Sequence, residues 1–394
     1  MTRLLCCADL HLGAGASMLP PGERLKDQEQ VLDRIADLAD EREVDAILIA
    51  GDVFHRPRPT PEELHVFRRF ERRLDYLPIL ACNGNAGHDL EGDGRPSALE
   101  LFANRHLAVH SAPGLWRHRE SSDAPTVGTL PSVPIGRLVA ALPDTSRDEL
   151  YAMAAELLIG QAAELRSQGA RILMAHWTVS GGITATGHPA GPDFGVVLPL
   201  AELQALGFDA VILGHLHAHQ VLSEDPFIAY CSTPIAKDFG EEHGRHGIWI
   251  LDIEGGATNR EYIEIPSRPL VTLDVDFTDG YDFSMLLEGY EPFVSTIREG
   301  GIYRVRYTAS EEQARRISQH EIRAALIAAG AAAVTFDPTI LRATRARGEG
   351  ITQAATLLDQ VDLYLDANPL PDGRGERVRD LIRSLTTDRQ GALL

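Results

Sequence analysis

Five short polar motifs each stand directly after an apolar segment of strand length. Apolar runs of about 4–8 residues are typical of strands buried on both faces, as in sheets covered by helices. A polar side chain just after such a strand lies at its carboxyl end, where open α/β sheets bind ligands. We therefore expect an α/β chain in which one crevice gathers all five motifs. The motifs are Asp9-Leu10-His11, Gly51-Asp52, Gly84-Asn85 followed by His88-Asp89, His176, and Gly214-His215-Leu216-His217.

Helical segments alternate with these strands. Val31, Ile35, Leu38 and Ala39 recur at helical spacing and predict a helix over Asp27–Glu41. The alternation is typical of a layered βαβα fold. Further helices are expected over Glu62–Leu74 after Pro61, Tyr151–Ser167 and Pro199–Leu206.

The rest of the sequence predicts an irregular segment, a small second domain and a helical tail. Ser111–Pro134 is rich in Ser, Pro and Gly and is expected to be irregular. Pro266–Pro269 is a plausible domain boundary. After it we expect a small α+β module with strands at Leu270–Phe277, Ile302–Tyr307 and Ala332–Phe336 and a helix at Glu311–Ala329. Two amphipathic helices, Ile351–Leu365 and one through Val378–Leu385, end the chain and need a surface that buries their apolar faces.

The polar motifs together predict a metal site. In an extended chain, residues i and i+2 point to the same side, so the carboxylate and imidazole of Asp9 and His11 can share one ion. Taken singly, each motif has an ordinary alternative, because Asp at a strand end is often a turn or cap residue and a lone His is often structural. Their conjunction favours ligation. Mixed carboxylate and imidazole ligands suit Mn, Fe or Zn.

The order of the motifs resembles that of the calcineurin-like metallophosphoesterases: D-x-H, G-D, G-N with H-D, a lone His, and G-H-x-H. Within that class the chain resembles the SbcD nuclease subunits and their archaeal and eukaryotic double-strand-break repair counterparts. ADLHLG at Ala8–Gly13 and GDVFHRPRPTPEEL at Gly51–Leu64 carry this likeness. The resemblance implies two mixed β-sheets flanked by helices over 1–265, a capping and DNA-recognition domain over 266–340, and a helical tail over 341–394.

The resemblance also implies roles for single residues. Asp9, His11 and His217 would hold one metal; Asn85, His176 and His215 would hold the other; Asp52 would bridge both. His88 would contact the scissile phosphate and assist the leaving oxygen. His55 matches a histidine near the nucleic acid in the repair nucleases, and an ordinary loop position before a helix is an equal alternative.

One departure from the family pattern affects His88. Ala86 and Gly87 stand between Asn85 and His88, which are adjacent residues in the family. A bulge could return His88 to its usual place, or the insertion could displace it and impair catalysis. Asn83 is a reserve ligand.

The activity implied is hydrolysis of DNA phosphodiesters by an exonuclease and endonuclease of recombination and repair, with two divalent ions, Mn²⁺ first and Fe, Zn or Mg as alternatives. Two other interpretations stay open: a phosphoesterase for small molecules or phosphoproteins, and a DNA-end-binding scaffold with weak catalysis. The net charge of −20 argues against a stand-alone DNA binder.

The implied partners are DNA as double-strand ends, hairpins or single strands, and an SbcC-like ABC-type ATPase. The tail helices would dock on that ATPase or pack back on their own domain. A homodimer would form through Glu62–Leu74 and the segment after His88. With no apolar run of about 18 residues and no secretory signal, we expect a cytoplasmic protein without a membrane span. Cys6, Cys7 and Cys82 are expected to be small buried apolar residues.

Overall fold

The structure is a computed structural model that describes residues 1–15, 19–90, 95–117, 125–133, 136, 142, 144–192, 195–254, 257–279, 297–342, 354 and 356–391. The chain divides into two compact units. The first comprises Met1–Asp274, Leu286–Arg306 and Gln319–Asp337, and the second Val275–Met285, Tyr307–Ser318 and Pro338–Leu394.

Two six-stranded mixed sheets form the centre of the first unit. The first sheet has the order β14-β13-β1-β2-β3-β4, in which β1 to β4 are parallel and β13 and β14 are antiparallel. Its strands are β1 (Thr2–Cys7), β2 (Ala46–Ile49), β3 (Ile79–Cys82), β4 (Leu107–His110), β13 (Gly247–Ile253) and β14 (Ala257–Glu264).

The second sheet has the order β11-β12-β10-β7-β6-β5. Its strands are β5 (Gly114–Trp116), β6 (Thr126–Leu130), β7 (Ala170–His176), β10 (Ala210–Gly214), β11 (Gln220–Glu224) and β12 (Phe227–Tyr230). A further two-stranded ladder joins β8 (Thr178–Val179) to β9 (Val197–Leu198).

The prediction of an irregular excursion over Ser111–Pro134 was wrong, because β5 and β6 lie within it. All five residues of β6 are buried, and the strand pairs in parallel with β7. Its Thr and Val side chains favour a strand, but the Ser, Pro and Gly residues around it conceal that signal.

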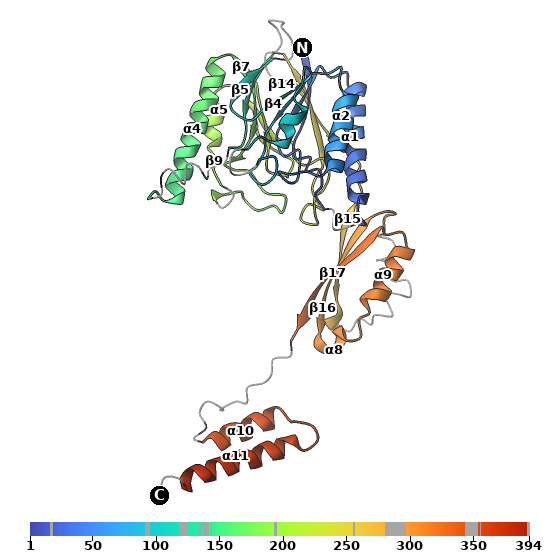
Figure 1. Cartoon of the computed structure of the whole chain (residues 1–394), viewed down its shortest axis with the longest axis vertical. Helices are drawn as coiled ribbons and strands as arrows, with labels where there is room; N and C mark the ends of the chain where they lie inside the picture. The colour runs from blue at the N-terminus through green and yellow to red at the C-terminus, as the bar shows by residue number, and fades with distance from the viewer. Residues whose placement is uncertain are drawn as a thin grey trace. The chain divides into compact units, whose positions relative to one another are not determined.

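Alternation along the strands divides the first unit into four layers. In β1, Leu4 and Cys6 face the second sheet and join a core between the sheets, whereas Leu5 and Cys7 face helices on the outside. In β7, Leu173 and Ala175 face the helices on the outside of the second sheet. Figure 1 shows α1 and α2 over one face and α4 and α5 over the other. The predicted α/β sandwich of two mixed sheets flanked by helices is thereby confirmed.

The helices of the sandwich begin at identifiable caps. α2 (Pro61–Arg73) and α4 (Arg147–Ser167) start from capping boxes at Thr60 and Ser146, whose side chains accept from Glu63 N and Glu149 N. Ser146 explains why α4 begins four residues before its predicted start. The further helices bounded within the described residues of the sandwich are α1 (Glu23–Glu41), α5 (Leu200–Ala205) and the 3₁₀ helix η2 (Ala98–Phe102).

The segment after Pro269 contains a three-stranded sheet with the order β15-β16-β17. One continuous helix over Glu311–Ala329 was predicted, but two helices form, with the weak helix formers Ile317 and Ser318 in the break. The elements are β15 (Leu270–Asp276), η4 (Phe277–Asp279), β16 (Ile302–Ser310), α8 (Glu311–Ala314), α9 (Gln319–Ala328) and β17 (Ala333–Leu341).

Two helices, α10 (Leu357–Ala367) and α11 (Arg374–Gly391), contact each other near the end of the chain. Arg379 of α11 forms ion pairs with Asp362 and Asp366 of α10. Part of the predicted helix Ile351–Leu365, namely residues 351–353 and 355, lies outside the described residues. All four cysteines are buried and free.

Candidate metal centre

The predicted ligands lie at the carboxyl ends of five strands, β1, β2, β3, β7 and β10, and main-chain hydrogen bonds join several of these segments. Asp9 N donates to Gly51 O and His11 N to Asp52 O, each at 2.9 Å, so the loops after β1 and β2 run side by side. In the second sheet, Gly214 pairs in register with His176. The strand ends therefore bring together motifs that are up to about 200 residues apart in sequence.

Four of the candidate ligands have left-handed backbone. Asp9, His11, Asp52 and His215 have φ angles of 54°, 43°, 53° and 96°. Such angles are uncommon for residues other than glycine and cluster at active sites, where the surrounding structure holds the strain. Here they turn side chains that follow three buried strands, β1, β2 and β10, toward one point.

Two glycines allow the backbone to approach this point. A Cβ on Gly84 would lie 2.0 Å from Asp52 Oδ1, and a Cβ on Gly214 would lie 2.0 Å from Ala50 O. No side chain fits at either position, which explains the glycines that precede Asn85 and His215.

The first half of the centre consists of Asp9, His11 and His217. His11 Nε2 lies 3.1 Å from His217 Nε2, and these two nitrogens lie 4.0 and 3.8 Å from Asp9 Oδ1. Asp9 and His11 are buried. His217 Nδ1 donates to Glu241 Oε1 at 2.6 Å, which leaves the Nε2 lone pair directed at its neighbours.

The second half consists of Asn85, His176 and His215. Asn85 N and Nδ2 donate to the two Asp52 oxygens at 2.7 and 3.3 Å, and Nδ2 also lies 2.8 Å from His215 Nδ1. His176 Nδ1 donates to Ala50 O at 2.7 Å, so Nε2 faces the centre, 3.4 Å from Asp52 Oδ2.

Asp52 lies between the two halves. Its Oδ2 is 3.7 Å from His11 Nε2 in one half and 3.4 Å from His176 Nε2 in the other. Asn83, the reserve ligand, instead donates to Ser111 Oγ at 2.9 Å.

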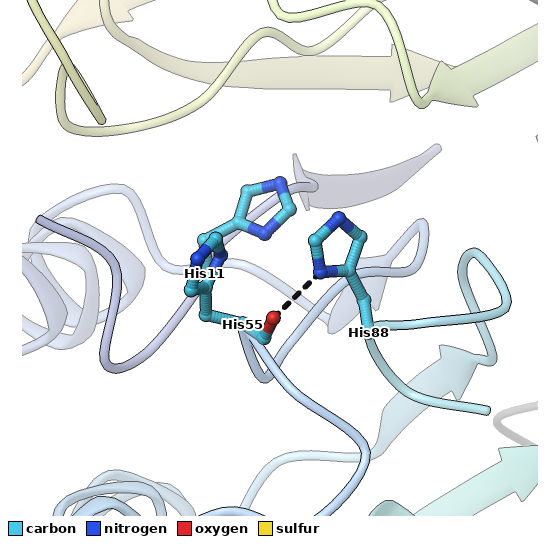
Figure 2. A group of neighbouring side chains, drawn as sticks. All are labelled: His11, His55 and His88. Carbon is cyan, nitrogen blue, oxygen red and sulfur yellow. Dashed lines mark hydrogen bonds between the residues drawn. The ribbon is translucent and has the colours of Figure 1, made fainter. Parts of the chain in front are cut away.

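The insertion of Ala86 and Gly87 forms a tight turn. Gly87 has a φ of 102°, its N–H donates to Leu90 O, and His88 N donates to Asn85 O. His88 therefore returns to the centre, with Nε2 4.0 Å from Asp52 Oδ2 and its ring 4.6 Å from that of His11. His88 Nδ1 donates to His55 O at 2.7 Å, as Figure 2 shows.

His55 lies on the same side of the centre. Its ring stacks on His88 at 5.3 Å and lies 5.6 Å from His11. The three rings converge from separate loops in Figure 2, and their nitrogens are near enough to hold one ion. Burial, and then the charge of His88, lower the pKa of His55 to about 4.

Burial and neighbouring charges together shift the pKa values of the other groups. It raises the pKa of Asp9 to about 6, against the opposing effects of His176 and His217. Burial lowers the pKa of His215 to about 3. For His176, burial lowers the pKa, but Asp52 and Asp9 outweigh it and raise the value to about 9. A neutral His215 and carboxylates that need a positive neighbour suit cation binding.

The residues present fit divalent metal ions. Asp9 and Asp52 are two fully buried carboxylates, and burying such charges without a cation is costly. His176 Nε2 is buried and makes no hydrogen bond. Two further groups, Asp9 with His11 and His217 and Asp9 with Asp52 and His176, present their ligand atoms within 4.8 Å of one another.

Two residues beside the centre were not assigned a role from the sequence. The buried Asp89 carboxylate accepts from Val53 N, Phe54 N and Gly84 N at 3.2, 3.0 and 3.0 Å and joins the loops after β2 and β3. Glu241 supports His217 from a loop after β12. The H-D motif pointed toward Asp89, whereas nothing in the spacing of Glu241 indicates its contact.

Comparison with known proteins agrees with this geometry. Residues 2–219 match the calcineurin-like phosphoesterase family, and the chain belongs to that family. It is 26% identical over 288 residues, 69% of this chain and 71% of the relative, to the SbcD subunit of the nuclease SbcCD of Staphylococcus epidermidis. The predicted family is thereby confirmed. Members of the family use divalent metals, so a metal-dependent phosphoesterase is the activity that the family defines.

Two solved structures are also similar. One is Yfce, a phosphoesterase from E. coli, with 13% identity over 64% of this chain and 88% of that chain and a TM-score of 0.28. The other is a dimetal phosphatase from Danio rerio, with 11% identity over 67% and 98% and a TM-score of 0.41. None of the helices in the described ranges is long and apolar enough to cross a membrane.

Proposed function

We propose that this chain is a Mn²⁺-dependent DNA nuclease, an exonuclease and endonuclease that acts as the nuclease subunit of an SbcCD-type complex in DNA recombination and repair. The observation that carries the proposal is the convergence of His11, His176 and His88 on Asp52 Oδ2, at 3.7, 3.4 and 4.0 Å. The similarity to an SbcD subunit supports DNA as the substrate.

In this proposal Asp9, His11 and His217 hold one ion, Asn85, His176 and His215 hold the other, and Asp52 is shared. Two such ions supply a nucleophile at neutral pH and neutralise charge on the phosphoryl oxygens. The protein fixes the ligands: Ala50 O holds the tautomer of His176, and Glu241 holds that of His217.

His88 is the proposed general acid. Its Nδ1 donates to His55 O, so Nε2 is the atom that faces substrate and can carry a proton to the departing 3′ oxygen. The backbone carbonyl fixes the ring orientation, and the stacked His55 limits its rotation. His55 itself would contact the nucleic acid.

Depressions on two sides of His215 favour a polymeric substrate. One, of about 530 Å³, is lined by Thr184, His188, His217 and Lys237. The other, of about 430 Å³, is lined by Asn85, His88, Ser132 and Tyr151. A chain with phosphates on both sides of the scissile bond can occupy both, whereas a small monoester needs only one. Lys237 offers a charge for a neighbouring phosphate.

The test uses purified full-length protein with Mn²⁺ and a duplex labelled at one end. His88→Ala should lower the cleavage rate by about 10²–10⁴-fold, the usual contribution of a general acid, and should still bind two ions. Glu156→Ala, at an exposed position of α4 that has no part in the centre or in the proposed interfaces, is the control and should cleave like the wild type. Cleavage by His88→Ala at the wild-type rate would refute the assignment.

The tail is proposed to bind the ATPase partner. Leu357, Leu363, Leu381 and Leu385 are exposed apolar residues on α10 and α11, and such residues favour a partner surface. A chain that ends at Arg342 should stay folded and lose co-purification with the ATPase. Unfolding of that chain would instead favour packing of the tail on its own domain. We further propose DNA recognition by 266–340 and a homodimer through Glu62–Leu74.

A second candidate is a phosphoesterase for small molecules or phosphoproteins. The observation that favours it is the net charge of −20, which opposes binding of a polyanion without a partner. Release of phosphate from monoesters by a protein that leaves DNA intact would select this candidate.

A further inference from the structure

The carboxylate of Glu241, which is not one of the candidate ligands, lies behind His217. Glu241 is 4% exposed, and its Oε1 accepts from His217 Nδ1 at 2.6 Å. Its Oε2 accepts from Lys237 N at 2.7 Å and from Thr233 Oγ1 at 3.4 Å. Both carboxylate oxygens are thus used, and the side chain is fixed on its own loop.

The pairing determines which nitrogen of His217 is available. With its proton on Nδ1 and held by Glu241, the imidazole presents Nε2 to the centre, 3.8 Å from Asp9 Oδ1. A carboxylate behind a ligating histidine also fixes the ring orientation and raises the basicity of the ligand. For His176 the main-chain carbonyl of Ala50 accepts the Nδ1 proton, and Ala50, the residue directly after β2, is itself held by a bond from its N–H to Cys7 O of β1.

Glu242, the next residue in the loop, contacts β15 and β16 instead of His217. Glu242 accepts from Thr272 Oγ1 of β15 at 2.7 Å and lies 3.8 Å from Arg304 Nη2 of β16. Arg304 also lies 4.7 Å over the ring of Phe239 and donates to Thr272 Oγ1. Adjacent residues of one loop therefore contact His217 on one side and β15 and β16 on the other.

The same loop packs on these strands through apolar contacts. Ala236 belongs to a small cluster with Leu19, Leu270 and Ile302, against which Phe239 also packs. Arg24 of α1 donates to Ala236 O, and its partner Asp27 accepts two bonds from Arg268, at 2.7 and 2.8 Å. The loop is thus held from several sides, and a shift of β15 or β16 would be transmitted to Glu241.

We propose that Glu241 is a positioning residue for His217, and that β15 and β16 set its position through Glu242, Thr272 and Arg304. The three-stranded sheet then adjusts the affinity of one of the two metal ions. The inference rests on the proposed function only for the metal centre, and not for DNA as substrate.

The test measures Mn²⁺ binding to the full chain by equilibrium dialysis after chelator treatment. The wild type should bind two ions. Glu241→Ala should lower the affinity for one ion by about 10–100-fold, the usual effect of losing the partner of a ligating histidine. The affinity for the other ion should stay unchanged. Glu241→Gln, which keeps an acceptor oxygen, should cause a smaller loss of affinity for the first of these ions. Glu264→Gln, a surface carboxylate paired with Arg245, is the matched control.

A spectroscopic measurement separates positioning from general stability. Nitrogen NMR of the metal-free protein at alkaline pH, where the imidazole is neutral, should show His217 as the Nδ1–H tautomer in the wild type and as a tautomer mixture in Glu241→Ala. If Glu241→Ala and Glu241→Gln bind both ions with wild-type affinity and keep the tautomer, the positioning role is refuted.

The link to the sheet is tested by a double-mutant cycle. A variant that combines Thr272→Val and Arg304→Met should have a lower affinity for the same ion. In a protein that already carries Glu241→Ala, the same pair of substitutions should cause no further loss of affinity. An equal loss in both backgrounds would overturn the link. A wild type that binds no Mn²⁺ would refute the metal centre itself, whereas one that binds two ions and cleaves no DNA would refute only the proposed substrate.

Discussion

The two halves of the candidate metal centre are built differently. In the second half, His176 is anchored by the main-chain carbonyl of Ala50 and Asn85 by direct bonds to Asp52. In the first half, His217 is anchored by a side chain, Glu241, from a loop. Ala50 directly follows β2 and its N–H donates to Cys7 O of β1, so its carbonyl is held by the sheet. The Glu241 carboxylate lies on a loop, so its position depends on the groups that pack on that loop. One half is therefore expected to be constant and the other adjustable.

The largest effect is expected where the halves meet. Asp52→Asn removes the charge that both halves share, so both ions should bind more than about 100-fold more weakly, beyond the loss of a single partner behind a ligand. Equilibrium dialysis with Mn²⁺ measures both affinities. Asp33→Asn on the exposed face of α1 is the control. If one ion keeps its affinity, Asp52 belongs to one half and the comparison must be redrawn.

Gly84→Ala should act on the second half. The new Cβ would lie 2.0 Å from Asp52 Oδ1, so the Asn85 loop must move and lose its 2.7 Å bond to Asp52. We expect about 1–3 kcal/mol less stability on urea unfolding, typical of overpacking. The affinity for the ion held by Asn85 should fall more than the affinity for the ion held by His217.

The control for this change is Gly160→Ala, an exposed position in α4 where a Cβ would meet nothing within 4 Å. It should raise the stability by about 0.5–1 kcal/mol, because alanine suits a helix interior better than glycine. Equal weakening of both ions in Gly84→Ala would show that the halves do not respond separately.

The sequence predicted that the candidate ligands gather at one place for a physical reason, whereas their division into two halves came from the family resemblance. Asp9 and Asp52 follow neighbouring strands of the first sheet, and His176 and His215 stand at the ends of neighbouring strands of the second, so each pair must lie close together. The packing of the two sheets then brings the pairs together. The return of His88 depends on the left-handed turn at Gly87, which residue types allow but do not require. Glu241 could not be predicted, because its contact with His217 depends on the path of a loop that has no periodicity. Strand β6 was missed since its turn-rich flanks obscured five buried residues.

The smallest effect concerns an ion pair outside both halves. Arg3 Nε donates to Asp252 Oδ1 at 2.7 Å and joins β1 to β13. This bond, partly opposed by burial, holds the pKa of Asp252 below its ordinary value. The pair therefore contributes stability that is present above the unfolded pKa of about 3.9 and is lost as pH falls through the lower folded pKa.

Because Arg3 is partly exposed, the contribution should not exceed about 1 kcal/mol. Urea unfolding of Asp252→Asn and the wild type should differ by that amount at pH 7, and the difference should vanish as pH falls below the lowered folded pKa of Asp252. Both Mn²⁺ affinities should stay unchanged in Asp252→Asn, because the pair touches neither half; a weaker first-half ion would mean that β13 also adjusts His217, and that the sheet is not the constant element we take it to be.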